Sequence, residues 1–191
     1  MSTSGAAAAA SRLPLAERWA RIRLAVFDVD GVLTDGSLQL SGSGRRTAGS
    51  VATEAKPFHV LDGHGIKQLT RAGIEVAWIS GRECAAVRER ARELGVERLH
   101  QGVADKLPLL CSIVAELGLS TTAPFAQVLC MGDDLADLPL MRNCAIAVTV
   151  PHAPAPVKLA ADLVLRAPGG RGAVREACDR LLHGCGRHDL L

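Results

Sequence analysis

The chain has 191 residues, of which 48% are hydrophobic, enough for one domain with a buried core. Its 22 basic and 20 acidic residues nearly balance and only 3% of residues are aromatic, so the composition argues against a nucleic-acid partner. The apolar runs are short and are broken by proline, glycine or charge, so no membrane span is expected.

The N-terminal residues 1–11 consist mainly of serine, glycine and alanine and lack the basic start and leucine-rich segment of a secretory signal. We expect a disordered or partly helical leader over 1–20, in which Trp19 packs onto the domain. A single domain is expected over 21–183, followed by a tail over 184–191. The six cysteines form no C-x-x-C pair or metal-ligand spacing, which is typical of reduced thiols in a cytoplasmic protein.

The first predicted strand is the apolar run 22–27, and polar residues begin where it ends. Asp28 and Asp30 lie there, followed by Gly31, at which the backbone can turn closely, and by Thr34. Ligands of open α/β sheets bind outside the carboxyl ends of strands. Two carboxylates this close at the end of a core strand need a cation or a proton, although a solvated acidic turn would show the same pattern.

After this loop, residues 37–60 predict a β-hairpin flap whose tip, 41–50, is rich in serine, glycine and arginine. The rest of the chain alternates helices and strands, which predicts a mostly parallel, doubly wound sheet with helices on both faces. No segment is long enough for a folded cap domain. The expected helices are 66–72, 84–94, 105–117 and 173–182, and the expected strands are 74–79, 97–100, 126–131, 144–148 and 162–165.

Polar groups also follow two later strands. Ser80, Gly81 and Arg82 come directly after one of them, and the other is followed by a group of three acidic residues, Asp133, Asp134 and Asp137. In a doubly wound sheet these strand ends converge on the crevice that contains Asp28 and Asp30.

Lys106 opens a predicted helix, where the helix dipole disfavours a cation, and this suggests that an anion holds it there. Several carboxylates without a histidine ligand indicate a hard cation, and Mg²⁺ fits best. Two like charges about 4 Å apart cost on the order of 4 kcal/mol at an effective dielectric of 20, so a phosphate needs both Mg²⁺ and Lys106 to bind beside these aspartates. With them, Asp28 can attack phosphorus, and Asp30 can act as acid and then base.

This set of motifs resembles the haloacid dehalogenase superfamily of phosphotransferases, with its Rossmann-like core. The resemblance implies that Asp28 is the nucleophile and a metal ligand, that Asp30 is the acid/base and binds Mg²⁺ through its carbonyl, and that Asp133 is the third ligand. It also implies that Ser80, Gly81 and Lys106 hold the phosphoryl group. Asp134 and Asp137 are expected to support the metal ligands from outside.

Three further segments, 58–66, 101–106 and 169–176, look like those of the capless 3-deoxy-D-manno-octulosonate 8-phosphate phosphatases. Those enzymes make a precursor of bacterial lipopolysaccharide, and neighbouring subunits of their tetramers close the active site. The resemblance implies a cytoplasmic homotetramer that acts on a sugar acid phosphate. Thr34, Arg82 and Arg171 are the expected substrate-binding residues, with Arg82 on the substrate carboxylate rather than on surface acids.

Some features leave the substrate open. The loop 41–50 is longer than in relatives, and Leu61 stands where many relatives have a basic residue. A nonulosonic acid 9-phosphate or another sugar phosphate is the alternative substrate, and a non-catalytic, oligomerising domain of the same fold is the alternative class. Asp62 is expected either to cap the helix that follows it or to act in the site or an interface.

Overall fold

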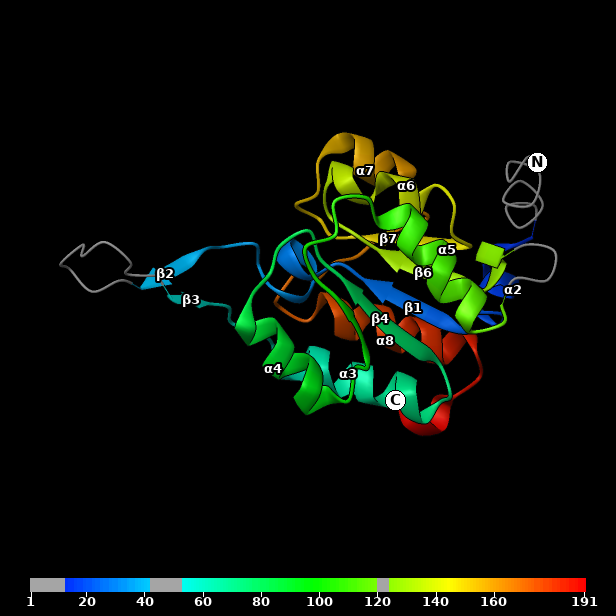
Figure 1. Ribbon diagram of the computed structural model, residues 1–191. Helices are drawn as coiled ribbons and strands as arrows, with labels where there is room; N and C mark the ends of the chain where they lie inside the picture. The colour runs from blue at the N-terminus through cyan, green and yellow to red at the C-terminus, as the bar shows by residue number, and fades with distance from the viewer. Residues whose placement is uncertain (1–12, 42–52, 120–123) are drawn as a thin grey trace.

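The computed structural model describes residues 13–41, 53–119 and 124–191. Most of the leader expected at 1–20 and the hairpin tip expected at 41–50 lie outside the described residues. The core is a six-stranded sheet in which every neighbouring pair is parallel, so the predicted doubly wound α/β fold is confirmed (Figure 1). In spatial order the strands are β5 (Arg98–His100), β4 (Glu75–Ile79), β1 (Leu24–Phe27), β6 (Val128–Met131), β7 (Ile146–Thr149) and β8 (Leu163–Val164).

Helices cover both faces of this sheet (Figure 1). One face carries α3 (Val60–Arg71), α4 (Ala85–Leu94) and α8 (Ala173–Gly184), and the other carries α5 (Lys106–Glu116) and α6 (Leu138–Met141). The shorter elements are α2 (Leu15–Trp19), α7 (Ala155–Ala160) and the helical turns η1 (Val29–Leu33), η2 (Pro124–Gln127), η3 (Leu135–Asp137) and η4 (His188–Leu190).

The central strand β1 explains why two separate hydrophobic clusters form. Side chains alternate between the two faces of a strand. Leu24 and Val26 therefore join the cluster beside α5, whereas Ala25 and Phe27 join the cluster beside α3 and α8. All four residues are buried, as expected for a strand of a parallel sheet covered on both faces.

A small antiparallel hairpin, β2 (Gln39–Ser41) and β3 (Thr53–Ala55), projects away from the body of the protein (Figure 1). It matches the expected flap, with shorter strands than the range 37–60 suggested. No cap domain is found in the part of the chain that the structure describes. The edge of the sheet at the base of the hairpin is therefore open.

Several helices differ from the expectation; α6 was not expected, and α3 and α7 show why such differences arise. α3 begins at Val60 instead of residue 66, although Gly63 and Gly65 lower the helix propensity of its first turns, because these glycines allow the helix to pack closely against Arg90 and Cys178. α7 was not expected, since it lies in a proline-rich stretch, yet Pro156 falls in its first turn, where a missing N–H costs nothing.

Asp62 does not cap its own helix, which was one of the two functions that the sequence suggested. Its buried carboxylate accepts hydrogen bonds from the N–H groups of Gly172 at 3.3 Å and Arg175 at 2.8 Å. It therefore caps α8, more than a hundred residues away, and not its own helix. Burial raises the pKa of Asp62 although these N–H groups oppose the shift.

The expected packing of Trp19 is confirmed, because this residue of α2 is buried in the cluster beside α8. None of the helices in the described ranges combines the length and the apolar composition needed to cross a membrane.

Candidate active site

The predicted polar groups meet at the carboxyl edge of the sheet. Asp28 follows β1, Ser80 follows β4 and Asp133 lies just beyond β6, so the three come from adjacent strands. Lys106, the first residue of α5, enters the same region. Asp28, Lys106 and Asp133 line a cavity of about 280 Å³, together with Asp30, Gly81, Val103, Ala104, Arg82, Asp134, Ala136 and Asp137. The convergence expected from the sequence is thus observed.

The buried Lys106 joins two of the carboxylates. Its Nζ donates to Asp28 Oδ1 at 2.6 Å and to Asp137 Oδ1 at 2.7 Å. Burial lowers the pKa of Lys106, but the charges of Asp28 and Asp137 outweigh it and the pKa is raised. The lysine therefore remains a cation at neutral pH, and the anions that hold it at the start of the helix are these two aspartates.

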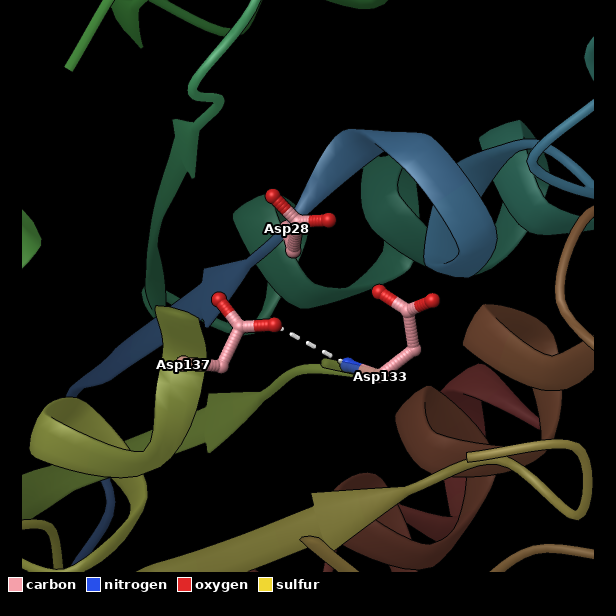
Figure 2. Close-up of side chains that lie close together, drawn as sticks. All are labelled: Asp28, Asp133 and Asp137. Atoms are coloured by element: carbon pink, nitrogen blue, oxygen red, sulfur yellow. Dashed lines mark hydrogen bonds between the residues drawn. The ribbon is translucent and has the colours of Figure 1, made fainter. Parts of the chain in front are cut away.

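Asp137 has both of its oxygens engaged. While Oδ1 accepts from Lys106, Oδ2 accepts from the N–H of Asp133 at 3.0 Å, a bond drawn in Figure 2, and from the N–H of Asp134 at 3.2 Å. Asp134 is exposed, and its carboxylate caps η3 by accepting from the N–H of Leu135 at 2.7 Å. Both residues thus help to fix the loop that presents Asp133.

Three carboxylates, those of Asp28, Asp133 and Asp137, each place an oxygen within 4.8 Å of the others. Figure 2 shows the three side chains turned toward a shared space. Burial, with the nearby charge of Asp137, raises the pKa of Asp28 to about 6. Burial and the charges of Asp28 and Asp137 raise the pKa of Asp133 to about 8. The pocket thus concentrates more negative charge than Lys106 alone can offset.

This arrangement fits a divalent cation. The donors are carboxylate oxygens, which Mg²⁺ prefers, and no soft ligand is present in the described cluster. The raised pKa of Asp133, about 8, means that this carboxylate is largely protonated at neutral pH unless a positive charge is added, and the raised pKa of Asp28, about 6, shows the same unfavourable concentration of negative charge. Asp137 is in the cluster but already saturated, so Asp28 and Asp133 are the side chains free to bind the ion.

Asp30 belongs to a second group of contacts on the other side of Asp28. Its carboxylate pairs with the ammonium of Lys56 and accepts from the hydroxyl of Ser80 at 3.3 Å. Ser80 is buried and also accepts from the N–H of Arg82 at 3.0 Å. The serine expected to hold phosphate thus lies beside the expected acid/base.

Gly31 makes this loop possible. Its φ of 91° lies in the left-handed region, and a Cβ atom at this position would overlap the carboxylate of Asp133. The backbone can therefore turn directly beneath the metal site only because residue 31 lacks a side chain.

Of the three expected substrate-binding residues, only Arg82 lines the cavity. Its guanidinium pairs with Glu54 at 3.1 Å. Thr34 instead is buried inside the loop, where its hydroxyl donates to Val29 O at 3.3 Å and accepts from Gly31 and Gly36 N–H. Arg171 is exposed, does not line the cavity, and lies 3.4 Å from Asp35.

The Gly-rich bend at 169–172 packs against the loop 28–36 of its own chain. Gly170 N–H donates to Val32 O at 2.9 Å, and a Cβ atom on Gly169 would overlap the carbonyl of Gly31. These two glycines thus permit close approach between two segments of the chain, where the sequence suggested freedom to reach outward.

Sequence reasoning missed Lys56 and Glu54. Both lie in the segment assigned only to the hairpin, and their partners Asp30 and Arg82 are more than twenty residues away in the chain. The available signal was the position of Lys56, directly before Pro57 and Phe58 in the segment that connects the hairpin to the next helix.

A search against models of protein families found no match. The chain is 39% identical over 168 residues to the 3-deoxy-D-manno-octulosonate 8-phosphate phosphatase KdsC of Escherichia coli (strain K12), covering 88% of this chain and 83% of the relative. The crystal structure of the phosphatase of that name from Moraxella catarrhalis, in complex with a magnesium ion, a phosphate ion and a KDO molecule, aligns with a TM-score of 0.81. Its identity is 34%, over 92% of this chain and 94% of that one.

The cobalt-bound form of the deoxy-D-mannose-octulosonate 8-phosphate phosphatase from Haemophilus influenzae aligns with a TM-score of 0.78 and 37% identity, over 91% of this chain and 95% of that one. Sequence and fold therefore point to the same group of enzymes.

Proposed function

Because this chain belongs to the 3-deoxy-D-manno-octulosonate 8-phosphate phosphatase family of the haloacid dehalogenase superfamily, we propose that it hydrolyses 3-deoxy-D-manno-octulosonate 8-phosphate to the free sugar acid and phosphate. The observation that carries the proposal is the acidic cluster at the carboxyl edge, in which Lys106 joins Asp28 to Asp137. The reaction would serve lipopolysaccharide precursor synthesis in the cytoplasm.

Asp28 is the proposed nucleophile. Its Oδ1 is held by Lys106, which leaves Oδ2 free to attack phosphorus. The new bond joins Oδ2 to phosphorus while the ester bond breaks, and the leaving sugar oxygen takes a proton from Asp30. Asp30 then accepts a proton from the water that hydrolyses the aspartyl-phosphate, which releases phosphate and restores both aspartates.

The side chains of Asp28 and Asp133, with the backbone carbonyl of Asp30, would hold Mg²⁺. This ion supplies positive charge that offsets the carboxylates and stabilises the charge on the phosphoryl oxygens. Lys106, Ser80 and the backbone around Gly81 are placed to orient the phosphoryl group by donating hydrogen bonds.

We further propose that the site is completed by a neighbouring subunit of a homotetramer. The cavity is open and no cap covers it within the described ranges. Exposed apolar side chains on and beside the hairpin, Leu38, Leu40, Val60 and Leu61, offer a surface for such a contact. Arg171 is exposed at the edge of the catalytic loop, where it would supply a cation for a substrate carboxylate.

The test is phosphate release with Mg²⁺ across a panel that contains the octulosonate 8-phosphate, a nonulosonic acid 9-phosphate and simple sugar phosphates. We expect the highest kcat/KM on the first, no turnover with excess chelator, and no turnover by Asp28→Asn. A higher kcat/KM on a different panel member would reassign the substrate. No release from any member by a folded, Mg²⁺-loaded protein would favour the non-catalytic domain.

A further inference from the structure

The second strand of the hairpin sends two charged side chains back toward the pocket. Lys56 directly follows β3, and its side chain is only 1% exposed. Its ammonium pairs with the carboxylate of Asp30 and lies 3.7 Å from the carboxylate of Glu54. Glu54 in turn accepts from the guanidinium of Arg82 at 3.1 Å. A continuous chain of contacts thus runs from Arg82 through the hairpin to Asp30.

The two buried lysines pair with different carboxylates. Lys106 contacts Asp28 and Asp137, whereas Lys56 contacts Asp30 and Glu54. Lys56 does not line the cavity, whereas its partner Asp30 does. We therefore expect Lys56 to act on the reaction through Asp30 rather than by direct contact with the ester.

Asp30 needs a partner that fixes its carboxylate, because it lies in an irregular and partly exposed loop. It belongs to η1, whose backbone is non-helical at this residue and at Gly31, and its side chain is 24% exposed. Its contacts among the described residues are with Lys56 on Oδ1 and with Ser80 on Oδ2, at 3.3 Å. A general acid must stay within hydrogen-bond reach of the leaving oxygen, so a freely rotating carboxylate would spend much of its time misplaced.

We propose that Lys56 is a positioning residue that holds the Asp30 carboxylate in the orientation needed for proton transfer. Glu54 in turn holds the ammonium of Lys56 in place. Lys56 occupies Oδ1, which leaves Oδ2, the oxygen beside Ser80, to give its proton to the leaving group. The stalk of the hairpin is then part of the active site of its own subunit. This inference rests on the proposed acid/base function of Asp30.

The test compares two phosphate esters that differ in their need for a proton. A sugar phosphate releases an alkoxide and depends on general acid assistance, whereas 4-nitrophenyl phosphate releases a stable phenolate and does not. Because Asp30 also acts as base on the aspartyl-phosphate that both esters form, the first step is measured alone, as the rate of alcohol or phenol release in single-turnover reactions. For Lys56→Met we expect this rate to fall about 10²-fold with the sugar phosphate and less than about tenfold with 4-nitrophenyl phosphate, with little change in the affinity for either ester. Lys56→Arg should recover part of the loss.

Asp30→Asn provides the reference. It should show the same preference for the aryl ester, and adding Lys56→Met to it should cause no further loss. The matched control is Lys158→Met on α7, which removes a lysine far from the hairpin and should leave both esters unaffected. Glu54→Gln is the milder probe if Lys56→Met folds poorly, and it should shift the two esters in the same unequal way.

Three results would overturn the inference: equal losses on both esters for Lys56→Met, a further loss in the Asp30→Asn background, or no recovery by Lys56→Arg in a folded protein. If Asp30→Asn itself loses both esters equally, the acid function of Asp30 fails, and the inference fails with it. If Asp30→Asn discriminates between the esters and Lys56→Met does not, only the inference about Lys56 fails.

Discussion

At the scale of single residues, the pocket depends on one buried cation between two carboxylates. Lys106→Met should remove the partner of both Asp28 and Asp137 and leave two uncompensated charges below the protein surface. Breaking such a buried pair typically costs about 3–5 kcal/mol of unfolding free energy. We expect a loss of this size in urea unfolding, together with loss of turnover. A stability unchanged from the parent protein would contradict the pairing.

The raised pKa values of Asp28 and Asp133 predict an unusual pH dependence for the metal-free protein. Both values, about 6 and about 8, lie above the ordinary 3.8, so the folded state binds more protons than the unfolded state between about pH 4 and pH 8. Its stability should therefore fall as the pH rises through this window. Melting curves from pH 5 to pH 9 in chelator should show the fall.

Mg²⁺ provides the control for this prediction. Protons and the cation compete for the same carboxylates, so the stabilisation by Mg²⁺ should be small at pH 5 and should grow toward pH 9. A metal-free melting temperature that rises from pH 5 to pH 8 would contradict the assignment.

Residues beside strands were predictable and residues on the hairpin were not. Asp28, Ser80 and Asp133 come at or just after the ends of apolar runs. Because strands and helices alternate along the chain, the sheet is parallel and these strand ends meet at one edge. The pairing of Lys56 with Asp30 depends on how the hairpin folds back, and no local pattern encodes that path. The burial of the Thr34 hydroxyl could not be predicted either, because the sequence does not indicate whether the side chain of a loop threonine faces the protein interior or the solvent.

At the scale of elements, the bend at 169–172 and the loop 28–36 hold each other in place. Gly169→Ala would drive a methyl group into the carbonyl of Gly31, and backbone atoms cannot move aside cheaply. Overpacking of this kind costs about 1–3 kcal/mol. We expect a lower melting temperature and a lower kcat, measured on the same preparation.

Gly186→Ala is the matched control for that variant. Gly186 has a φ of 71°, so alanine is strained there, yet no atom lies within 4 Å of the added methyl group. It should lose stability by about 1–2 kcal/mol and keep the parent kcat. An unchanged kcat in Gly169→Ala would show that the bend does not support the loop.

Most strands and the long helices lie where apolar periodicity and glycine stop signals predicted them. The ends of several elements shifted because tertiary contacts override local preference. α3 starts early despite Gly63 and Gly65, since its first turn carries Asp62 to the start of α8 and its glycines permit close packing there. This gain in packing at the cost of helix propensity can be seen only in the folded protein.

At the scale of the whole molecule, the open cavity and the exposed apolar residues around the hairpin predict an assembly. Sedimentation should detect a tetramer, and activity per site should fall when the protein is diluted to monomer. Leu40→Asp, at a side chain in the hairpin that is exposed in the single chain, should weaken assembly with little effect on the melting temperature of the monomer. A fully active monomer would refute completion of the site by a neighbour.

Arg171→Ala tests the same assembly from the substrate side. It should raise KM for the sugar acid phosphate far more than KM for a small phosphate ester that lacks a carboxylate. Because Arg171 is exposed and bonded only to Asp35 among the described residues, its removal should hardly change stability. Equal changes in KM for the two substrates would exclude a contact with the carboxylate.

The docking of α8 has a consequence for how the protein is made. The proposed nucleophile, Asp28, follows the first strand of the sheet, yet the loop that carries it packs against a bend near residue 170 and against a helix capped by Asp62. During synthesis, Asp28 leaves the ribosome long before its support exists. The nascent chain should therefore remain inactive until α8 has emerged and docked.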